Sequence, residues 1–222
     1  MTSTKASAFA MAISILWIAD TRAQAAGHDL PAGFRSLAGV TLNRDSAATI
    51  RAKLGPTRER QVGTGHGAYV TWCYAPASAR PDALLELMSD ASDMGTPGRA
   101  LNVIRLRVDA PSAERDGCAS LRTSVKLTTP AGLRLGISRA NIEDLLGTPR
   151  RQAGDSLTYY FDAKEYLGSD NPAFAAWNTP ERRESCFDAG LPYANVGATV
   201  IIVLRDDHAV EIRVERYDQS IC

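Results

Sequence analysis

The sequence contains few of the residues from which catalytic and metal sites are usually built. It has three histidines and four cysteines in 222 residues, and no two cysteines form a Cys-x-x-Cys pair. Structural zinc ligands usually occur in such closely spaced pairs, so no metal site is expected. No Gly-x-Ser-x-Gly elbow is present, and the glycine-rich run 63–67 precedes a predicted strand, whereas phosphate loops lead into helices. We therefore predict a protein that is not an enzyme and has no cofactor.

An excess of charge of either sign is also lacking. Basic and acidic residues number 25 each, and without the first 25 residues the chain has 23 basic and 24 acidic residues. This balance gives no electrostatic reason to expect nucleic acid or an anionic membrane as a partner.

Long hydrophobic runs are absent, apart from one near the amino terminus. Lys5 precedes an uncharged apolar run over residues 6–19, and Ala23-Gln24-Ala25 is a small-x-small site. The run is shorter than the about 20 residues that a spanning helix needs, and the pattern is typical of a cleaved signal peptide. We expect residues 1–25 to be this peptide, Ala26 to begin the mature protein, and the location to be periplasmic or secreted. No cysteine near the site can accept a lipid, so a stable membrane anchor is not expected.

An internal repeat organises the rest of the chain. Blocks 39–42, 60–63 and 71–74 recur as blocks 132–135, 151–154 and 158–161. Four residues of the first copy return in the second with identical spacing: Ser46, Ile50, Leu54 and Gly55 as Ser138, Ile142, Leu146 and Gly147. We expect a first repeat over residues 26–128 and a second over residues 129–222.

Each copy of this block predicts a short helix. Ser46 and Ser138 stand at N-cap positions, where a hydroxyl accepts from backbone N–H groups of the first turn. The apolar residues four apart share one face of the helix. Gly55 and Gly147 follow the last turn, where a left-handed conformation is expected. A helix of about nine residues is not stable alone in water, so its apolar face must pack against another element.

A sheet supplies that element. Apolar and polar residues alternate over 70–74, 104–108, 157–161 and 210–214, which is typical of half-buried strands. Residues 83–88 predict a further strand, residues 200–204 a central one, and residues 205–208 a polar turn. The predicted fold class is α+β, with two tandem repeats, each a short helix packed on an antiparallel sheet of three or more strands.

The repeated block, Gly-x-x-Leu followed by Ser-x-x-x-Ile and Leu-Gly, with an aromatic strand after it, resembles a known family. It is similar to the SmpA/OmlA-type lipoproteins of outer-membrane assembly and to β-lactamase-inhibitor proteins, which carry two such units in tandem. The resemblance covers residues 39–74 and 132–161. It implies a protein-binding or envelope-assembly role.

The cysteines predict two disulfide bonds, because an even number in an oxidising compartment favours pairing. Cys118 and Cys222 each follow the last predicted strand of a repeat, and an antiparallel sheet returns the chain towards its earlier strands. We therefore predict a Cys73–Cys118 bond and a Cys186–Cys222 bond, each within one repeat.

Two surfaces are candidates for binding. An insertion at residues 163–195 has no counterpart in the first repeat and carries five of the chain's aromatics, among them Tyr166, Phe174, Trp177 and Tyr193. Aromatics near arginines are typical of binding hot spots, although a small core under a long loop explains them as well. The second surface is the outward face of the predicted strands. It carries Arg105, Arg107, Glu211, Arg213 and Glu215, and most such faces are only solvated.

The pattern favours a non-enzymatic periplasmic or secreted module that binds another envelope or secreted protein, and an inhibitor-like role is one form of this hypothesis. An envelope or outer-membrane assembly factor is the alternative, and a hydrolase with dispersed active-site residues is the third hypothesis. Asp206, Asp207 and His208 are candidate metal ligands, but a charged hairpin turn is the commoner explanation.

Overall fold

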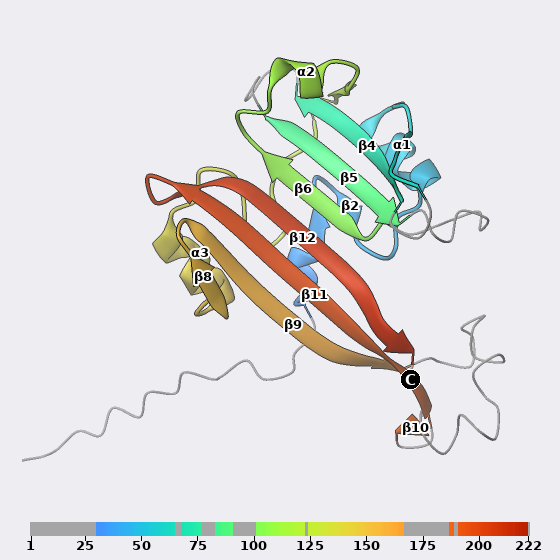
Figure 1. Ribbon diagram of the computed structural model, residues 1–222, viewed down its shortest axis with the longest axis vertical. Coiled ribbons are helices and arrows are strands. Elements are labelled where there is room, and N and C mark those ends of the chain that lie inside the picture. The colour runs from blue at the N-terminus through green and yellow to red at the C-terminus, as the bar shows by residue number, and fades with distance from the viewer. Residues whose placement is uncertain are drawn as a thin grey trace, which may run out of the picture.

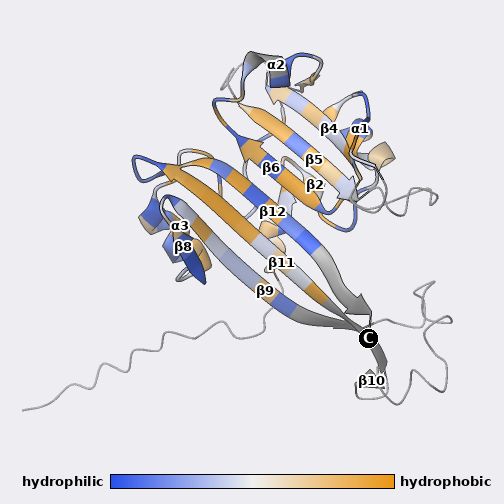
Figure 2. Ribbon diagram, viewed as in Figure 1, coloured by the Kyte–Doolittle hydropathy of each residue, from blue (hydrophilic) through white to orange (hydrophobic). Residues whose placement is uncertain are grey.

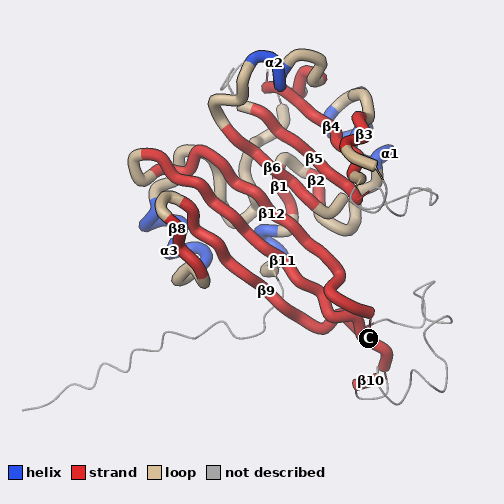
Figure 3. The backbone as a smooth tube through the Cα atoms, viewed as in Figure 1, coloured by secondary structure: helices blue, strands red, loops and turns tan. Residues whose placement is uncertain are grey.

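The computed structural model describes residues 30–64, 68–76, 83–90, 101–122, 124–166, 187–188 and 191–221. Strands dominate the described part of the chain (Figure 3). The first half contains η1 (Ala32–Phe34), β1 (Ser36–Leu37), β2 (Val40–Thr41), α1 (Ala47–Leu54), β3 (Arg60–Val62), β4 (Tyr69–Pro76), β5 (Leu84–Asp90), β6 (Val103–Arg107), α2 (Ser112–Arg115) and β7 (Ala119–Leu121). The second half contains α3 (Arg139–Leu146), β8 (Arg151–Ala153), β9 (Ser156–Tyr166), β10 (Phe187–Asp188), β11 (Leu191–Arg205) and β12 (His208–Ile221). The α+β class is confirmed.

Helices α1 and α3 begin and end as the sequence predicts, with one difference. The hydroxyls of Ser46 and Ser138 accept from the backbone N–H groups of Thr49 and Asn141, each at 3.4 Å. Gly55 and Gly147 follow the helices with φ of 114° and 78°. The positive φ agrees with the predicted left-handed conformation, but ψ is 169° and −159°, so the backbone is extended at these residues and not αL, for which ψ is about +47°. Glycine is required because extended ψ with positive φ excludes a Cβ.

Eight strands follow one another across the main sheet in the order β3-β4-β5-β6-β12-β11-β9-β8, and all the pairs along this path are antiparallel (Figure 1). The strands of the first half therefore occupy one side of the sheet and those of the second half the other. Strand β6 of the first half pairs directly with β12 of the second, from Glu211 opposite Arg107 to Glu215 opposite Val103. This seam joins the halves into one sheet.

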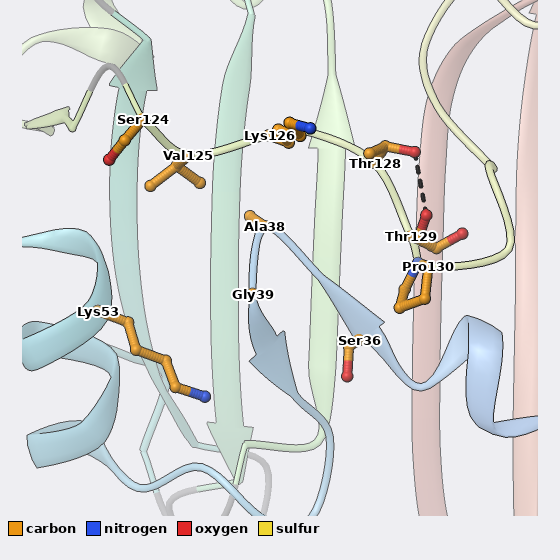
Figure 4. A pocket seen from close by; sticks show the side chains of 10 residues that line it. All are labelled: Ser36, Ala38, Gly39, Lys53, Ser124, Val125, Lys126, Thr128, Thr129 and Pro130. Carbon is orange, nitrogen blue, oxygen red and sulfur yellow. Dashed lines mark hydrogen bonds between the residues drawn. The ribbon is translucent and has the colours of Figure 1, made fainter.

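One face of the sheet, called the inner face below, packs against α1, α3 and the β1–β2 hairpin. Figures 1 and 4 view the sheet from opposite sides, and both place α1 and the hairpin on the same face. A single buried cluster runs along this face. It includes Ile50, Val70, Trp72, Tyr74, Leu87, Ile104, Leu106, Ile142, Leu157, Tyr159, Val200, Ile202, Ile212 and Val214. Burial of these alternate strand residues confirms the period-two pattern expected from the sequence.

The Cys73–Cys118 bond is present, as predicted, with 4.9 Å between the Cα atoms. It lies beside α2 and β7, two elements that the sequence did not indicate. Strand β7 pairs parallel to β4, with Tyr74 opposite Ala119. The chain after β6 therefore comes back to the edge of the sheet at β4. Cys186 and Cys222 lie outside the described residues. A disulfide bond is compatible with a location outside the cytoplasm.

Three further details differ from the sequence-based expectations. Strands β3 and β8 were not anticipated, because three residues are too few for an alternating pattern to be recognised. Strand β3 pairs with β4 and ends at Val62. The glycine-rich run 63–67 therefore begins directly after a strand, whereas the sequence predicted that it comes before the first strand of the sheet. Strand β6 ends at Arg107, one residue before the expected Val108.

Candidate binding surface on the outer sheet face

The outer face of the sheet, opposite α1 and α3, carries the charged residues that the sequence singled out. Arg105 and Arg107 lie on β6, next to buried Ile104 and Leu106, and so point away from the core. Glu211, Arg213 and Glu215 stand opposite this strand on β12 and alternate with buried Ile212 and Val214. Figure 2 shows the result as blue stretches on β12 beside the largely orange β11.

Arg105 stands at the centre of this surface and bridges the two halves of the sheet. Its Nε donates to Glu211 Oε1 at 2.7 Å, and its Nη2 donates to Glu211 Oε2 at 2.9 Å. Glu86 on β5 lies on the other side, with Oε2 at 3.5 Å from Nη1. The hydrogen bond with Glu211 raises the pKa of Arg105 above its ordinary value. A bidentate ion pair of this kind fixes the relative orientation of the two side chains as well as pairing their charges.

The neighbouring charges are paired in the same way. Arg107 donates from Nε to Glu86 Oε2 at 3.2 Å and also pairs with Glu114 of α2. Arg213 pairs with Glu215 along its own strand. We call Glu86, Arg105, Arg107, Glu114, Glu211, Arg213 and Glu215 the outer-face ion-pair network. The network contains three arginines and four glutamates and is therefore nearly neutral. Its ion pairs connect β5, β6, β12 and α2.

Exposed aromatics flank the network on both sides. Tyr160 on β9 is 44% exposed and Tyr69 on β4 is 37% exposed. The strand register places Tyr160 opposite Thr199, Thr199 opposite Glu215, and Glu215 opposite Val103. The row continues through Met88 to Thr71, two residues from Tyr69 on the same strand. Alternation along 157–161 places Tyr160 at an outward position, whereas Tyr69 lies one residue before the alternating block 70–74. Sequence reasoning concentrated on the insertion and selected neither tyrosine.

The structure brings together only part of the 163–195 insertion. Its ends belong to β9 and β11, and the backbones of Tyr166 and Tyr193 are opposite each other in the register. Their side chains, and all of Phe174 and Trp177, lie outside the described residues. The sequence-based choice between a binding element and a small core therefore stays open for these four residues.

The acidic turn is a β11–β12 hairpin turn, as its composition indicated. Asp206 and Asp207 have φ of 48° and 63°, a conformation that aspartate tolerates better than most residues. Asp207 accepts from Arg139 Nε at 2.7 Å, which ties the turn to α3. Within the described ranges, no group of three or more histidine, cysteine and acidic side chains is arranged to hold a metal ion.

Comparison with protein-family models, curated proteins and solved structures finds no match to this chain. Among the residues described, no helix is both long and apolar enough to cross a membrane.

Proposed function

We propose that this chain is a periplasmic or secreted module that binds another protein through the outer face of its sheet. The observation that carries this proposal is the pair of exposed tyrosines, Tyr69 and Tyr160, on either side of the outer-face ion-pair network. Tyrosine is enriched among the residues that dominate protein interfaces, because it supplies a large contact area with few rotatable bonds.

The proposal includes a tandem repeat as its architecture. Each half has a capped eight-residue helix followed by four antiparallel strands, α1-β3-β4-β5-β6 and α3-β8-β9-β11-β12. The mirrored strand order supports two copies joined at β6 and β12, over residues 26–128 and 129–222. Such a union doubles the width of the open face and leaves both helices on the opposite side. This arrangement also supports the resemblance to tandem inhibitor-like proteins.

Secretion rests on the amino-terminal pattern and on the Cys73–Cys118 bond. Amino-terminal sequencing of the protein recovered from its host tests this part. A mature chain that begins at Ala26 is the expected result, and a chain that retains residues 6–19 would contradict it.

Site-specific photo-crosslinking tests the binding surface. Benzoylphenylalanine is placed at Tyr160 on the outer face in one variant and at Leu145 on α3 in another. Leu145 is a matched control because it is 36% exposed on the opposite side of the molecule. We expect a discrete crosslinked protein from the Tyr160 variant alone, in cells that export the protein.

For the loss-of-binding test, benzoylphenylalanine is placed at Thr71, which leaves both tyrosines free to be changed. Replacing Tyr69 and Tyr160 by alanine should then remove the crosslinked protein. The same double substitution should leave the thermal unfolding temperature almost unchanged. Products of equal yield from Tyr160 and Leu145 would contradict a specific outer-face interface. A product identified as an outer-membrane β-barrel or an assembly subunit would favour the envelope-assembly alternative.

The insertion needs its own experiment, because its aromatics belong either to the interface or to a small core. Replacing Phe174, Trp177 and Tyr193 by alanine removes partner binding with little change in stability if the insertion is a binding element. Truncation of buried large aromatics instead costs about 3–5 kcal/mol. A large fall in melting temperature would therefore assign these residues to packing.

A further inference from the structure

A second candidate site lies on the inner side of the molecule, away from the proposed protein interface. A pocket of about 490 Å³ opens between α1, the β1–β2 hairpin and the segment 124–130 (Figure 4). Ligand pockets in proteins commonly have about 300–1,000 Å³, so this space is large enough for a small organic molecule. Its walls come from residues 36–53 on one side and residues 124–130 on the other, which are about 70 or more positions apart in the sequence, so no sequence motif indicated the pocket.

Hydrogen bonds fix the walls of the pocket in place. Ser36 and Thr41 join the two strands of the hairpin through their hydroxyls at 2.7 Å. The opposite wall is held by Thr129, whose Oγ1 accepts from the backbone N–H of Leu133 at 3.0 Å. The backbone N–H of Ala131 donates to Gly33 at 3.1 Å and ties the two walls together. The pocket is therefore built into the fold and does not need a ligand in order to form.

The charge of the lining is positive. Lys53 and Lys126 both line the pocket, and its other lining residues include no acidic side chain. This is notable in a chain that has 21 arginines and only four lysines. A lysine carries a compact charge with three donors that can turn towards a small anion.

The two ammonium groups differ in their surroundings. Lys53 Nζ lies 2.6 Å from Oδ2 of Asp45, which is buried and also accepts from the backbone N–H of Thr41 at 2.7 Å. The charge of Lys53 is thus largely balanced. Lys126 is exposed, and within the described part of the chain its ammonium has no ion pair or hydrogen bond. Lys126 therefore supplies the uncompensated charge of the pocket.

Apolar surface completes the lining. Ala38, Val125 and Pro130 face the same space as the lysines and the exposed hydroxyl of Ser124. A ligand that satisfies this lining has a single anionic head group and a short apolar body. We propose that the pocket binds a small amphipathic anion of the medium-chain carboxylate class, with its head group at Lys126 and its apolar body against Ala38, Val125 and Pro130.

Amide NMR titration with octanoate tests this proposal on the intact mature protein. We expect saturable chemical-shift changes confined to residues 36–39, 53 and 124–130. Octylammonium, which has the same apolar body and the opposite charge, should cause no comparable changes. Octanoate binding should also weaken as salt is raised, because the attraction is partly electrostatic.

The decisive variant is Lys126→Gln, because the side chain is exposed and its loss does not threaten the fold. Octanoate should bind this variant about fivefold or more weakly, as expected for loss of a charge-assisted contact. Arg151→Gln, which removes an exposed cation on β8 far from the pocket, is the matched control and should leave the affinity unchanged. Lys126→Arg should retain most of the binding, since the charge is kept.

Three results would overturn the proposal. The first is the absence of saturable shifts in the pocket residues at millimolar octanoate. The second is equal binding of octanoate and octylammonium, which would make the pocket a merely apolar surface. The third is an unchanged affinity in Lys126→Gln. None of these results depends on whether the outer face binds a protein, so the two proposals can fail separately.

Discussion

Arg105 on β6 donates to both carboxylate oxygens of Glu211 on β12, although the two residues are 106 positions apart in the chain. Strands β6 and β12 belong to different halves of the chain, so this pair crosses the seam at which the sheet is joined. The guanidinium also lies 3.5 Å from Glu86 of β5. The seam is thus reinforced on its outer face by ion pairs and on its inner face by the contact of Ile104 and Leu106 with the common core.

A double-mutant cycle on Arg105→Ala and Glu211→Ala measures what the seam pair contributes. The Arg105–Glu211 pair is partly buried and bidentate, so we expect a coupling free energy of about 1 kcal/mol in denaturant unfolding. The Arg205–Asp109 pair is the control, because both side chains are about half exposed or more. Its cycle should give no measurable coupling, as is common for surface pairs. Equal coupling in the two cycles would show that Arg105 is not special to the seam.

Two buried tyrosines should respond in opposite ways to loss of the hydroxyl. Tyr74 donates its hydroxyl to the carbonyl of Gly55 at 3.0 Å, which ties β4 to the end of α1. The buried hydroxyl of Tyr159 has no hydrogen-bond partner within the described residues. We expect Tyr74→Phe to cost about 1 kcal/mol of stability and Tyr159→Phe to be neutral or stabilising, since an unpaired buried hydroxyl is costly. Urea unfolding of the two variants decides the matter, and a larger loss in Tyr159→Phe would show that its hydroxyl is paired after all.

The same tyrosines predict a loss of stability at alkaline pH. Burial raises the pKa of Tyr74 to about 12, and it raises the pKa of Tyr159 to about 12 as well. The unfolded chain loses these protons from pH 10, while the folded protein keeps them. The contribution of the two tyrosines to the free energy of unfolding is therefore fully present below about pH 10. It is lost as the pH rises towards about 12, by roughly 2 kcal/mol for each tyrosine.

Denaturant unfolding at a series of pH values between 9 and about 11.5 checks this window. The double variant Tyr74→Phe/Tyr159→Phe should show a shallower fall than the wild type. Tyr160→Phe, at the exposed position next in sequence, should follow the wild type. An unchanged slope in the double variant would assign the alkaline loss to other groups.

Removal of the Cys73–Cys118 bond should destabilise the protein without changing its fold. The bond joins residues separated by 45 positions, and the chain-entropy model gives about 4 kcal/mol for a closed loop of this size. The variant in which both cysteines are replaced by serine should unfold at correspondingly lower denaturant, with unchanged far-UV circular dichroism. A loss well under 1 kcal/mol would mean that α2 and β7 hold this region without the bond.

The sequence alone determined the local features of the protein, because each depends on neighbours within a few positions. Ser46 and Ser138 cap helices through residues three positions later, and Val70, Trp72 and Tyr74 are buried because alternate strand residues share a face. The disulfide partner of Cys73 could also be predicted, since the chain of a meander returns close to its starting point. The outward positions of Arg105 and Arg213 were predictable from the same alternation.

Only the tertiary structure decided how the two halves meet. Antiparallel strands of similar composition can pair in several orders, and the choice of β6 beside β12 depends on burying both helices' apolar faces in one core. That choice brought Glu211 to Arg105 and placed the candidate binding arginines in one ion-pair network. Tertiary structure also placed Lys126 across a pocket from Lys53, 73 positions away in the chain. Such contacts carry no sequence periodicity, because the residues that form them are close only after the chain has folded.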